Sequence, residues 1–79
     1  MIDRSVLVDF LENDLGADLS DIKDDSALFS SGIIDSFALV TLMMHLEREG
    51  GFRINPGDVT LDNLDTIERI LAFSSRLSA

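Results

Sequence analysis

Apolar residues recur at helical spacing in three stretches of the chain, and this pattern predicts three main helices. The predicted helices run over residues 3–15, from 35 or 36 to 49, and from 65 or 66 to 77. Gly16 ends the first helix and Gly50-Gly51 ends the second, because glycine accepts the left-handed conformation that commonly follows a helix. The apolar positions that define the first and last helices are Ile2, Val6, Leu7, Phe10, Leu11, Ile67, Ile70, Leu71 and Leu77.

The segments between these helices differ in character. Residues 16–35 form a long connection rich in Asp and Ser, which must be fixed by the apolar side chains within it. Those side chains are Leu19, Ile22, Leu28, Phe29, Ile33 and Ile34. A turn at Asn55-Pro56-Gly57 precedes a short helical piece around 59–64. We therefore expect one all-α domain over 1–79, a small bundle of three main helices plus one short helix.

The second helix is apolar on two sides. At 100° per residue its core-facing positions share one arc, namely Leu39, Leu42, Met43 and Leu46. Phe37, Val40 and Met44 fall on nearly the opposite side. Either both sides are buried because the helix is central in the bundle, or the second side is an exposed surface for partner proteins.

Length, charge and cysteine content limit the classes of function and partner that the chain can have. A chain of 79 residues has no room for a deep active-site cavity, and the absence of cysteine excludes disulfides and thiolate metal sites. The net charge of −9 disfavours nucleic acid and anionic membranes and favours basic partner surfaces, although acidity can also serve solubility alone. No apolar run is long enough to span a membrane and no signal peptide is evident, so we expect a cytoplasmic protein.

Ser36, at the start of the second helix, is the candidate for chemistry. Most serines at such a position only cap the helix. A nucleophilic role is disfavoured because the single histidine, His45, lies about 13.5 Å further along the same helix. The aspartates lack the spacing of a calcium loop, so no specific metal site is expected, and only weak, unspecific divalent binding around 21–25 and 58–65 is left open. A helix N-terminus does favour a phosphate group, and a phosphodiester on Ser36 would suit that position.

The run from Asp25 to Phe37, which contains Gly-Ile-Ile-Asp-Ser, resembles the attachment region of acyl and peptidyl carrier proteins. The family pattern of Asp-Ser-Leu followed by a Val-x-Leu-x-x-x-Leu-Glu helix is matched by Asp35-Ser36-Phe37, Val40, Leu42, Leu46 and Glu47. The resemblance continues through Phe52-Arg53-Ile54 and Thr66-Ile67, and it covers nearly the whole chain.

This resemblance implies that Ser36 carries 4′-phosphopantetheine, which a phosphopantetheinyl transferase adds from coenzyme A. The thiol of that arm would hold an acyl or aminoacyl group as a thioester, and Asp35 would support the transfer and cap the helix. Loading ligases or synthetases and downstream acyl-transfer enzymes would be the partners of a monomeric, non-catalytic carrier. The expected partner-binding residues are Phe37, Val40, Thr41, Met44, Glu47 and Arg48.

Some residues depart from carriers of fatty-acid synthesis. Thr41, His45 and Arg48 stand where those carriers are often acidic or small, and Phe37 replaces the usual leucine. The Gly-Ile-Ile-Asp-Ser form is closer to stand-alone carriers such as D-alanyl carrier proteins or those of specialised biosynthetic clusters. We therefore expect a role in specialised biosynthesis. The alternative is an unmodified helical adaptor that binds partners through Phe37, Val40 and Met44.

Overall fold

A computed structural model describes residues 3–35 and 37–78, and its secondary structure is entirely helical. The elements are α1 (Arg4–Asn13), α2 (Ala38–Gly50), the 3₁₀ turn η1 (Pro56–Asp58), α3 (Leu61–Leu64) and α4 (Ile67–Ser78). No strand occurs within the described ranges. The predicted all-α class, with three longer helices and a short one, is confirmed.

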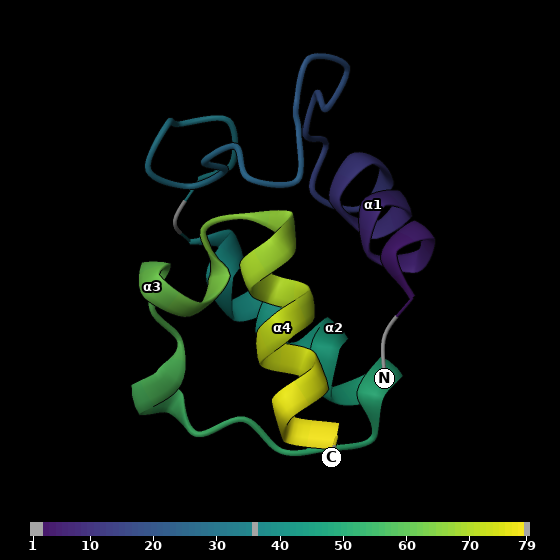
Figure 1. Cartoon of the computed structure of the whole chain (residues 1–79), viewed down its shortest axis with the longest axis vertical. Coiled ribbons are helices and arrows are strands. Elements are labelled where there is room, and N and C mark those ends of the chain that lie inside the picture. The colour runs from purple at the N-terminus through teal and green to yellow at the C-terminus, as the bar shows by residue number, and fades with distance from the viewer. Residues whose placement is uncertain (1–2, 36, 79) are drawn as a thin grey trace.

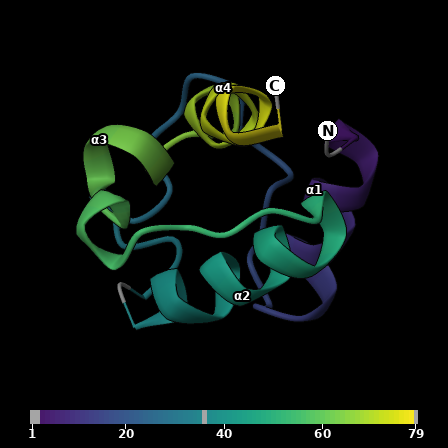
Figure 2. The same ribbon diagram turned by 90° about the horizontal axis from the view of Figure 1, so that it is seen from below.

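Helix α4 is the element around which the others are packed, because it contacts α1, α2 and α3. Seen from below, α4 and α2 lie on opposite sides, while α1 and α3 lie at the two ends between them (Figure 2). The long connection after α1 lies across the top of the bundle in Figure 1. Most of the side chains that fill the centre are apolar, and the apolar ones that are 0% exposed are Leu7, Leu11, Leu28, Leu42, Leu46, Leu64 and Ile70. Some polar residues are buried as well, namely His45, Asp65, Thr66 and Ser74.

Helix α1 is shorter than the sequence pattern predicts, and α4 begins one or two residues later and ends one residue later than predicted. Helix α1 stops at Asn13 because the N–H groups of Asp14 and Leu15 both bond to the carbonyl of Phe10, which breaks the regular ladder. Helix α4 begins at Ile67, after Thr66, whose hydroxyl accepts the N–H of Arg69 as an N-terminal cap. Helix ends are the least certain part of a pattern-based prediction.

Helix α2 ends as its glycines predict. It closes at Gly50, and Gly51 adopts the left-handed conformation (φ 69°) with its N–H bonded to the carbonyl of Glu47. The predicted turn at Asn55-Pro56-Gly57 becomes η1, in which the Asn55 side chain accepts the N–H of Gly57. The chain therefore crosses from α2 to α3 through an extended segment whose buried anchor is Ile54.

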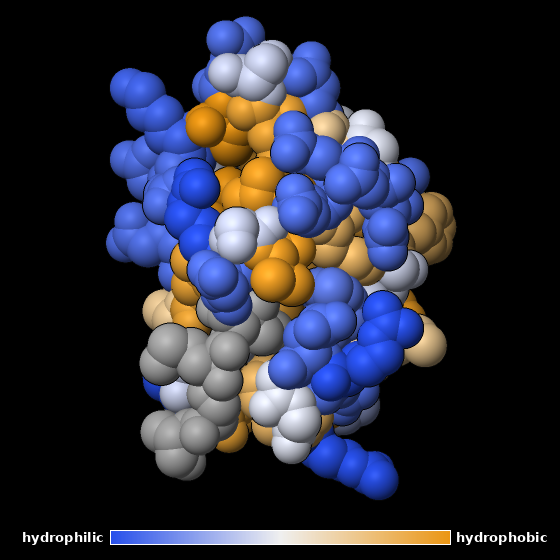
Figure 3. Space-filling model, turned by 90° about the vertical axis from the view of Figure 1, so that its right-hand side faces the viewer, coloured by the Kyte–Doolittle hydropathy of each residue, from blue (hydrophilic) through white to orange (hydrophobic). Residues whose placement is uncertain are grey.

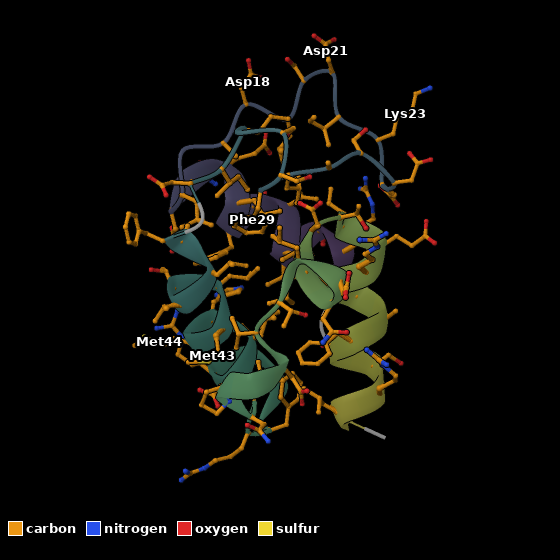
Figure 4. The ribbon with its side chains drawn as sticks, turned by 90° about the vertical axis from the view of Figure 1, so that its left-hand side faces the viewer. Asp18, Asp21, Lys23, Phe29, Met43 and Met44 are labelled. Carbon is orange, nitrogen blue, oxygen red and sulfur yellow. The ribbon has the colours of Figure 1, made fainter. Side chains whose placement is uncertain are left out.

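The long connection, residues 14–37, is fixed partly by the apolar side chains that the sequence suggests. Leu28, Phe29 and Ile34 are buried, and the side chain of Phe29 lies beneath the loop in Figure 4. Ile33 is exposed, so its prediction as an anchor is wrong. Asp18, Asp21 and Lys23 project from the outer edge of the loop (Figure 4).

Polar contacts join this connection to both ends of the chain. The guanidinium of Arg4 on α1 forms an ion pair with the Asp24 carboxylate, and the Asp24 carbonyl accepts the N–H of Glu68 on α4. Because Arg4 and Asp24 are half exposed, water screens their ion pair, which therefore contributes little to stability. On the side where α1 lies, hydrophilic side chains flank a strip of apolar surface (Figure 3). None of the described helices is both long enough and apolar enough to span a bilayer.

Candidate functional site

The entry to α2 is a tight turn that precedes the helix. The carboxylate of Asp35 accepts the N–H of Phe37 at 3.0 Å, and the carbonyl of Asp35 accepts the N–H of Ala38 at 2.9 Å. Helix α2 therefore starts at Ala38, and the predicted start at residue 35 or 36 is wrong by two or three residues. The Asp35 side chain turns the chain into the helix from just outside it, since Phe37 occupies the N-cap position.

Ser36, the predicted attachment residue, lies outside the residues that the structure describes. Its neighbours Asp35 and Phe37 are both exposed, so the described chain on either side of it runs along the surface. The preceding Gly32 has φ of 85°, a conformation that glycine adopts without strain and other residues rarely adopt. The described residues on both sides of position 36 are thus open to solvent, at the junction between the long connection and α2.

Exposed apolar side chains lie at the start of α2 and along one side of it. The exposed fractions are 87% for Phe37, 56% for Val40 and 62% for Met44. On the opposite side of the same helix, Leu42 and Leu46 are fully buried. Figure 4 shows Met44 on the outer side of α2 and Met43 toward the other helices. The interpretation of α2 as a central helix with both sides buried is therefore wrong for the described residues.

The polar residues of the predicted partner surface divide into two groups. Thr41 and Arg48 are exposed beside the apolar set. Glu47 is half-buried, and its carboxylate accepts the N–H of Ile54 at 2.8 Å, so it holds the segment after α2 in place. A groove of about 480 Å³ continues from this surface toward α1. Its lining residues are Phe10, Asp14, Thr41, Met44, His45, Glu47 and Arg48.

His45 is a buried residue of the α1–α2 interface. Its ring stacks on Phe10 with centroids 3.8 Å apart and planes 8° from parallel, and it is only 7% exposed. Neither ring nitrogen has a hydrogen-bond partner among the described residues. Burial lowers the pKa of His45, with a smaller contribution from Arg48, against the opposing effects of Glu49 and Asp14. At neutral pH His45 therefore adds no charge to the predicted partner surface, contrary to its grouping with Arg48 in the sequence.

Asp65 is a buried acidic residue that the sequence reasoning missed. It lies between α3 and α4, and its carboxylate accepts the N–H groups of Phe29 and Ser30 at 2.9 and 3.0 Å and the hydroxyl of Ser30 at 2.6 Å. Burial alone would raise the pKa of Asp65, but these hydrogen bonds outweigh it and hold the pKa below its usual range. No local pattern signals this contact, because its partners lie 35 and 36 residues away.

Comparison with known proteins identifies the family. The family profile described as "Phosphopantetheine attachment site" matches residues 5–74. The chain belongs to the phosphopantetheine-binding carrier proteins. It is 30% identical to a D-alanyl carrier protein of Leuconostoc mesenteroides subsp. mesenteroides and 29% identical to one of Leuconostoc citreum, in each case over 87% of both chains. A D-alanyl carrier protein of Abiotrophia defectiva is 33% identical over 62% of both chains.

Membership of this family supplies the cofactor and the general role. Carrier proteins of this kind hold 4′-phosphopantetheine covalently, so that group is the cofactor of this chain. The prosthetic arm provides a reactive thiol to a protein without cysteine. An exposed segment at the start of α2 suits such a group, because an arm fixed there extends into solvent. The partners of a carrier protein are enzymes such as transferases and ligases. No cluster of three or more metal-binding side chains occurs within residues 3–35 and 37–78.

Proposed function

We propose that Ser36 is the attachment residue and that the chain carries an acyl or aminoacyl group in specialised biosynthesis rather than in fatty-acid synthesis. The observation that carries this proposal is the position of Asp35-Ser36 inside the matched family region, between two exposed residues at the entry to α2. In the loading step the Ser36 hydroxyl attacks the pyrophosphate of coenzyme A. One phosphodiester bond forms, adenosine 3′,5′-bisphosphate leaves and the hydroxyl proton is released.

Each described neighbour has a part in this proposal. Asp35 supports the transfer by holding the turn into α2 through its bond to the Phe37 N–H. The exposed residues Phe37, Val40 and Met44 form the apolar centre of the partner surface, and Thr41 and Arg48 form its polar edge. We assign Glu47 a supporting place in that surface, since its carboxylate is already bonded to Ile54. The chain presents the bound group and separate enzymes act on it.

The similarity to three D-alanyl carrier proteins makes an amino acid the first cargo to test. An ATP-dependent ligase specific for D-alanine should load the modified chain, and the bound amino acid should be released by hydroxylamine. A ligase that activates fatty acids should load it poorly, because Arg48 and Thr41 replace the acidic surface of fatty-acid carriers. Preferential loading with fatty acid would contradict the specialised role without affecting the carrier role.

The experiment that tests the attachment is co-expression with a broad-specificity phosphopantetheinyl transferase, followed by intact-mass measurement. We expect a gain equal to one phosphopantetheinyl group in the wild-type chain and none in Ser36→Ala. A matched control is Ser20→Ala, which removes a hydroxyl from an exposed part of the long connection and should leave the gain unchanged. A gain that persists in Ser36→Ala would refute the assignment.

The exposed apolar set also suits an adaptor that binds partners without modification. That alternative predicts that Ser36→Ala binds every partner as tightly as the wild type. The carrier function predicts instead that Ser36→Ala loses all transfer of cargo, even where it still binds the enzymes.

A further inference from the structure

Asp65 raises a question that the carrier role alone does not answer, because a buried carboxylate is costly to retain. It is only 7% exposed at the junction of α3 and α4, far in sequence from the attachment segment. An amide or a hydroxyl would be less costly to bury. The contacts of Asp65 therefore need an explanation in terms of what they hold.

The hydrogen bonds that Asp65 accepts from distant parts of the described chain all come from one short stretch, residues 28–30. Besides the three bonds to its carboxylate, the backbone carbonyl of Asp65 accepts the N–H of Leu28 at 2.7 Å. Three consecutive backbone N–H groups of the long connection thus end on one residue. A single carboxylate oxygen that accepts two neighbouring N–H groups fixes the direction of the chain as well as its position.

The fixed stretch passes directly to the attachment segment. The carbonyl of Leu28 accepts the N–H of Ile34 at 3.0 Å, which closes residues 28–34 into a loop. Leu28 and Ile34 are both buried at the base of that loop. The residue after Ile34 is Asp35, whose carboxylate and carbonyl hold the first residues of α2. Hydrogen bonds between Asp65 and Leu28 and between Leu28 and Ile34, followed by the peptide link from Ile34 to Asp35, therefore connect Asp65 to the attachment segment. Asp35 in turn bonds to Phe37, on the other side of position 36.

Apolar packing by itself would not give the same result. Buried side chains such as Leu28 and Phe29 keep the loop on the bundle, but hydrophobic contact is not directional. Without the carboxylate, the N–H groups of Phe29 and Ser30 would lose their acceptor, and the loop would have to shift to satisfy them. The position of the loop is therefore set by Asp65.

We propose that Asp65 is a positioning residue for arm transfer, which holds residues 28–34 so that the attachment serine is presented in one place to the transferase. This inference rests on the proposed attachment at Ser36. Asp65 contacts neither coenzyme A nor the reacting hydroxyl in this account. It acts through Leu28, Ile34 and Asp35.

The test uses steady-state transfer of phosphopantetheine to the purified, unmodified chain, with hydrogen exchange measured on the same samples. Because the chain is the substrate, partial unfolding lowers its effective concentration and raises KM, whereas misplacement of the serine lowers kcat. For Asp65→Ala we expect kcat to fall by about tenfold or more with little change in KM, since small displacements of reacting groups are costly. Exchange should accelerate at Phe29, Ser30 and Ile34 but not inside α1.

Conservative and control variants separate positioning from general damage. Asp65→Asn keeps an oxygen that can accept the Phe29 and Ser30 N–H groups, and it should recover most of kcat. Asp62→Asn removes the same charge from an exposed position on α3 and should match the wild type. Ser30→Ala removes only the hydroxyl contact and should give a smaller loss of kcat. If Asp65→Ala does not fold, the kcat of Ser30→Ala tests the positioning role instead.

The outcomes are distinguishable from failure of the attachment itself. A wild-type chain that is never modified, or is modified at another residue, refutes the proposed function and this inference together. A wild-type chain modified at Ser36, with kcat unchanged in Asp65→Ala, overturns only the role of Asp65. The role of Asp65 is also overturned if Asp65→Ala changes only KM. If Asp65→Ala is unfolded, unchanged kcat and unchanged exchange in Ser30→Ala overturn it instead.

Discussion

At the scale of single residues, His45 shows how a titratable side chain can serve packing. Its ring covers Phe10 across the α1–α2 interface, and its nitrogens lack partners among the described residues. Burial lowers its pKa, so the unfolded chain binds the proton more readily than the folded chain. The stability that depends on neutral His45 is therefore fully present above about pH 6.5, the usual pKa of histidine. It is lost as the pH falls from there through the lower pKa that His45 has in the folded chain.

Replacing this ring tests that explanation. His45→Phe keeps an aromatic ring against Phe10 and removes two buried nitrogens without partners, so we expect the free energy of unfolding to rise by about 1 kcal/mol at pH 7.5. The variant should also lose less stability than the wild type between pH 7.5 and 5.5. Urea denaturation at the two pH values measures both effects.

The pH range is chosen to separate His45 from the acidic residues. Unperturbed carboxylates titrate near pH 4, and the pKa values of Asp18, Asp24 and Asp65 are lowered further by their hydrogen bonds. Equal loss of stability in His45→Phe and the wild type over this range would show that the histidine is not the titrating group. A less stable variant at pH 7.5 would show that the ring nitrogens have partners in solution.

At the scale of elements, α2 combines a buried side with an exposed apolar side that begins at Phe37. Since exposed side chains contribute little to folding, changes at Phe37 and Met44 should affect partner binding far more than stability. We expect Phe37→Asp and Met44→Asp each to raise KM for arm transfer by about tenfold, equivalent to about 1.4 kcal/mol of binding. Their melting temperatures should stay close to that of the wild type.

Val6→Asp is the matched control for these two variants. Val6 is another exposed apolar residue, but it lies on α1, away from the entry to α2. The Val6→Asp substitution introduces the same negative charge and should leave KM for arm transfer unchanged. Equal increases of KM in all three variants would attribute the effect to added negative charge and would remove the assignment of a partner surface to α2.

At the scale of the whole molecule, acidity is the dominant property. The net charge is −9, and the described residues contain a single ion pair, Arg4–Asp24. Self-repulsion should therefore destabilise the folded chain at low ionic strength, and salt should screen it. A gain of about 1 kcal/mol would raise the melting temperature by about 4–8 °C in a chain of this size.

Comparing two salts distinguishes screening from binding. No metal-binding cluster occurs in the part of the chain that the structure describes, so NaCl and MgCl₂ at equal ionic strength should raise the melting temperature equally. A flat response to both would show that the charges are already well dispersed. A much larger response to MgCl₂ would indicate a specific cation site.

The helices were predictable because their apolar residues recur at local, helical spacing, and Gly50-Gly51 marked the end of α2 correctly. The exposed apolar side of α2 was also visible as an alternative, since helix geometry alone places Phe37, Val40 and Met44 together. Helix starts were placed too early because residues just before a helix accept its first N–H groups without being helical themselves. The carbonyl of Asp35 accepts the N–H of Ala38, and the hydroxyl of Thr66 accepts the N–H of Arg69.

Long-range polar contacts were not predictable in this way. Asp65 looked like one more surface aspartate, and nothing near it in the sequence indicates that it bonds to Phe29 and Ser30. The burial of His45 had a weak signal, because it lies three residues after the buried Leu42 and therefore near the core side of α2. Its stacking on Phe10 depends on how α1 packs, which the sequence pattern does not specify.

The most direct test of the central claim is to locate the arm within the modified protein. The chain should be treated with a phosphopantetheinyl transferase and coenzyme A, digested and fragmented by tandem mass spectrometry. Ser30, Ser31 and Ser36 lie close together in the sequence, so fragment ions must separate them. We predict one phosphopantetheinyl group, found entirely on Ser36. An arm on Ser30 or Ser31, or no modification under conditions that modify a known carrier protein, would contradict the account.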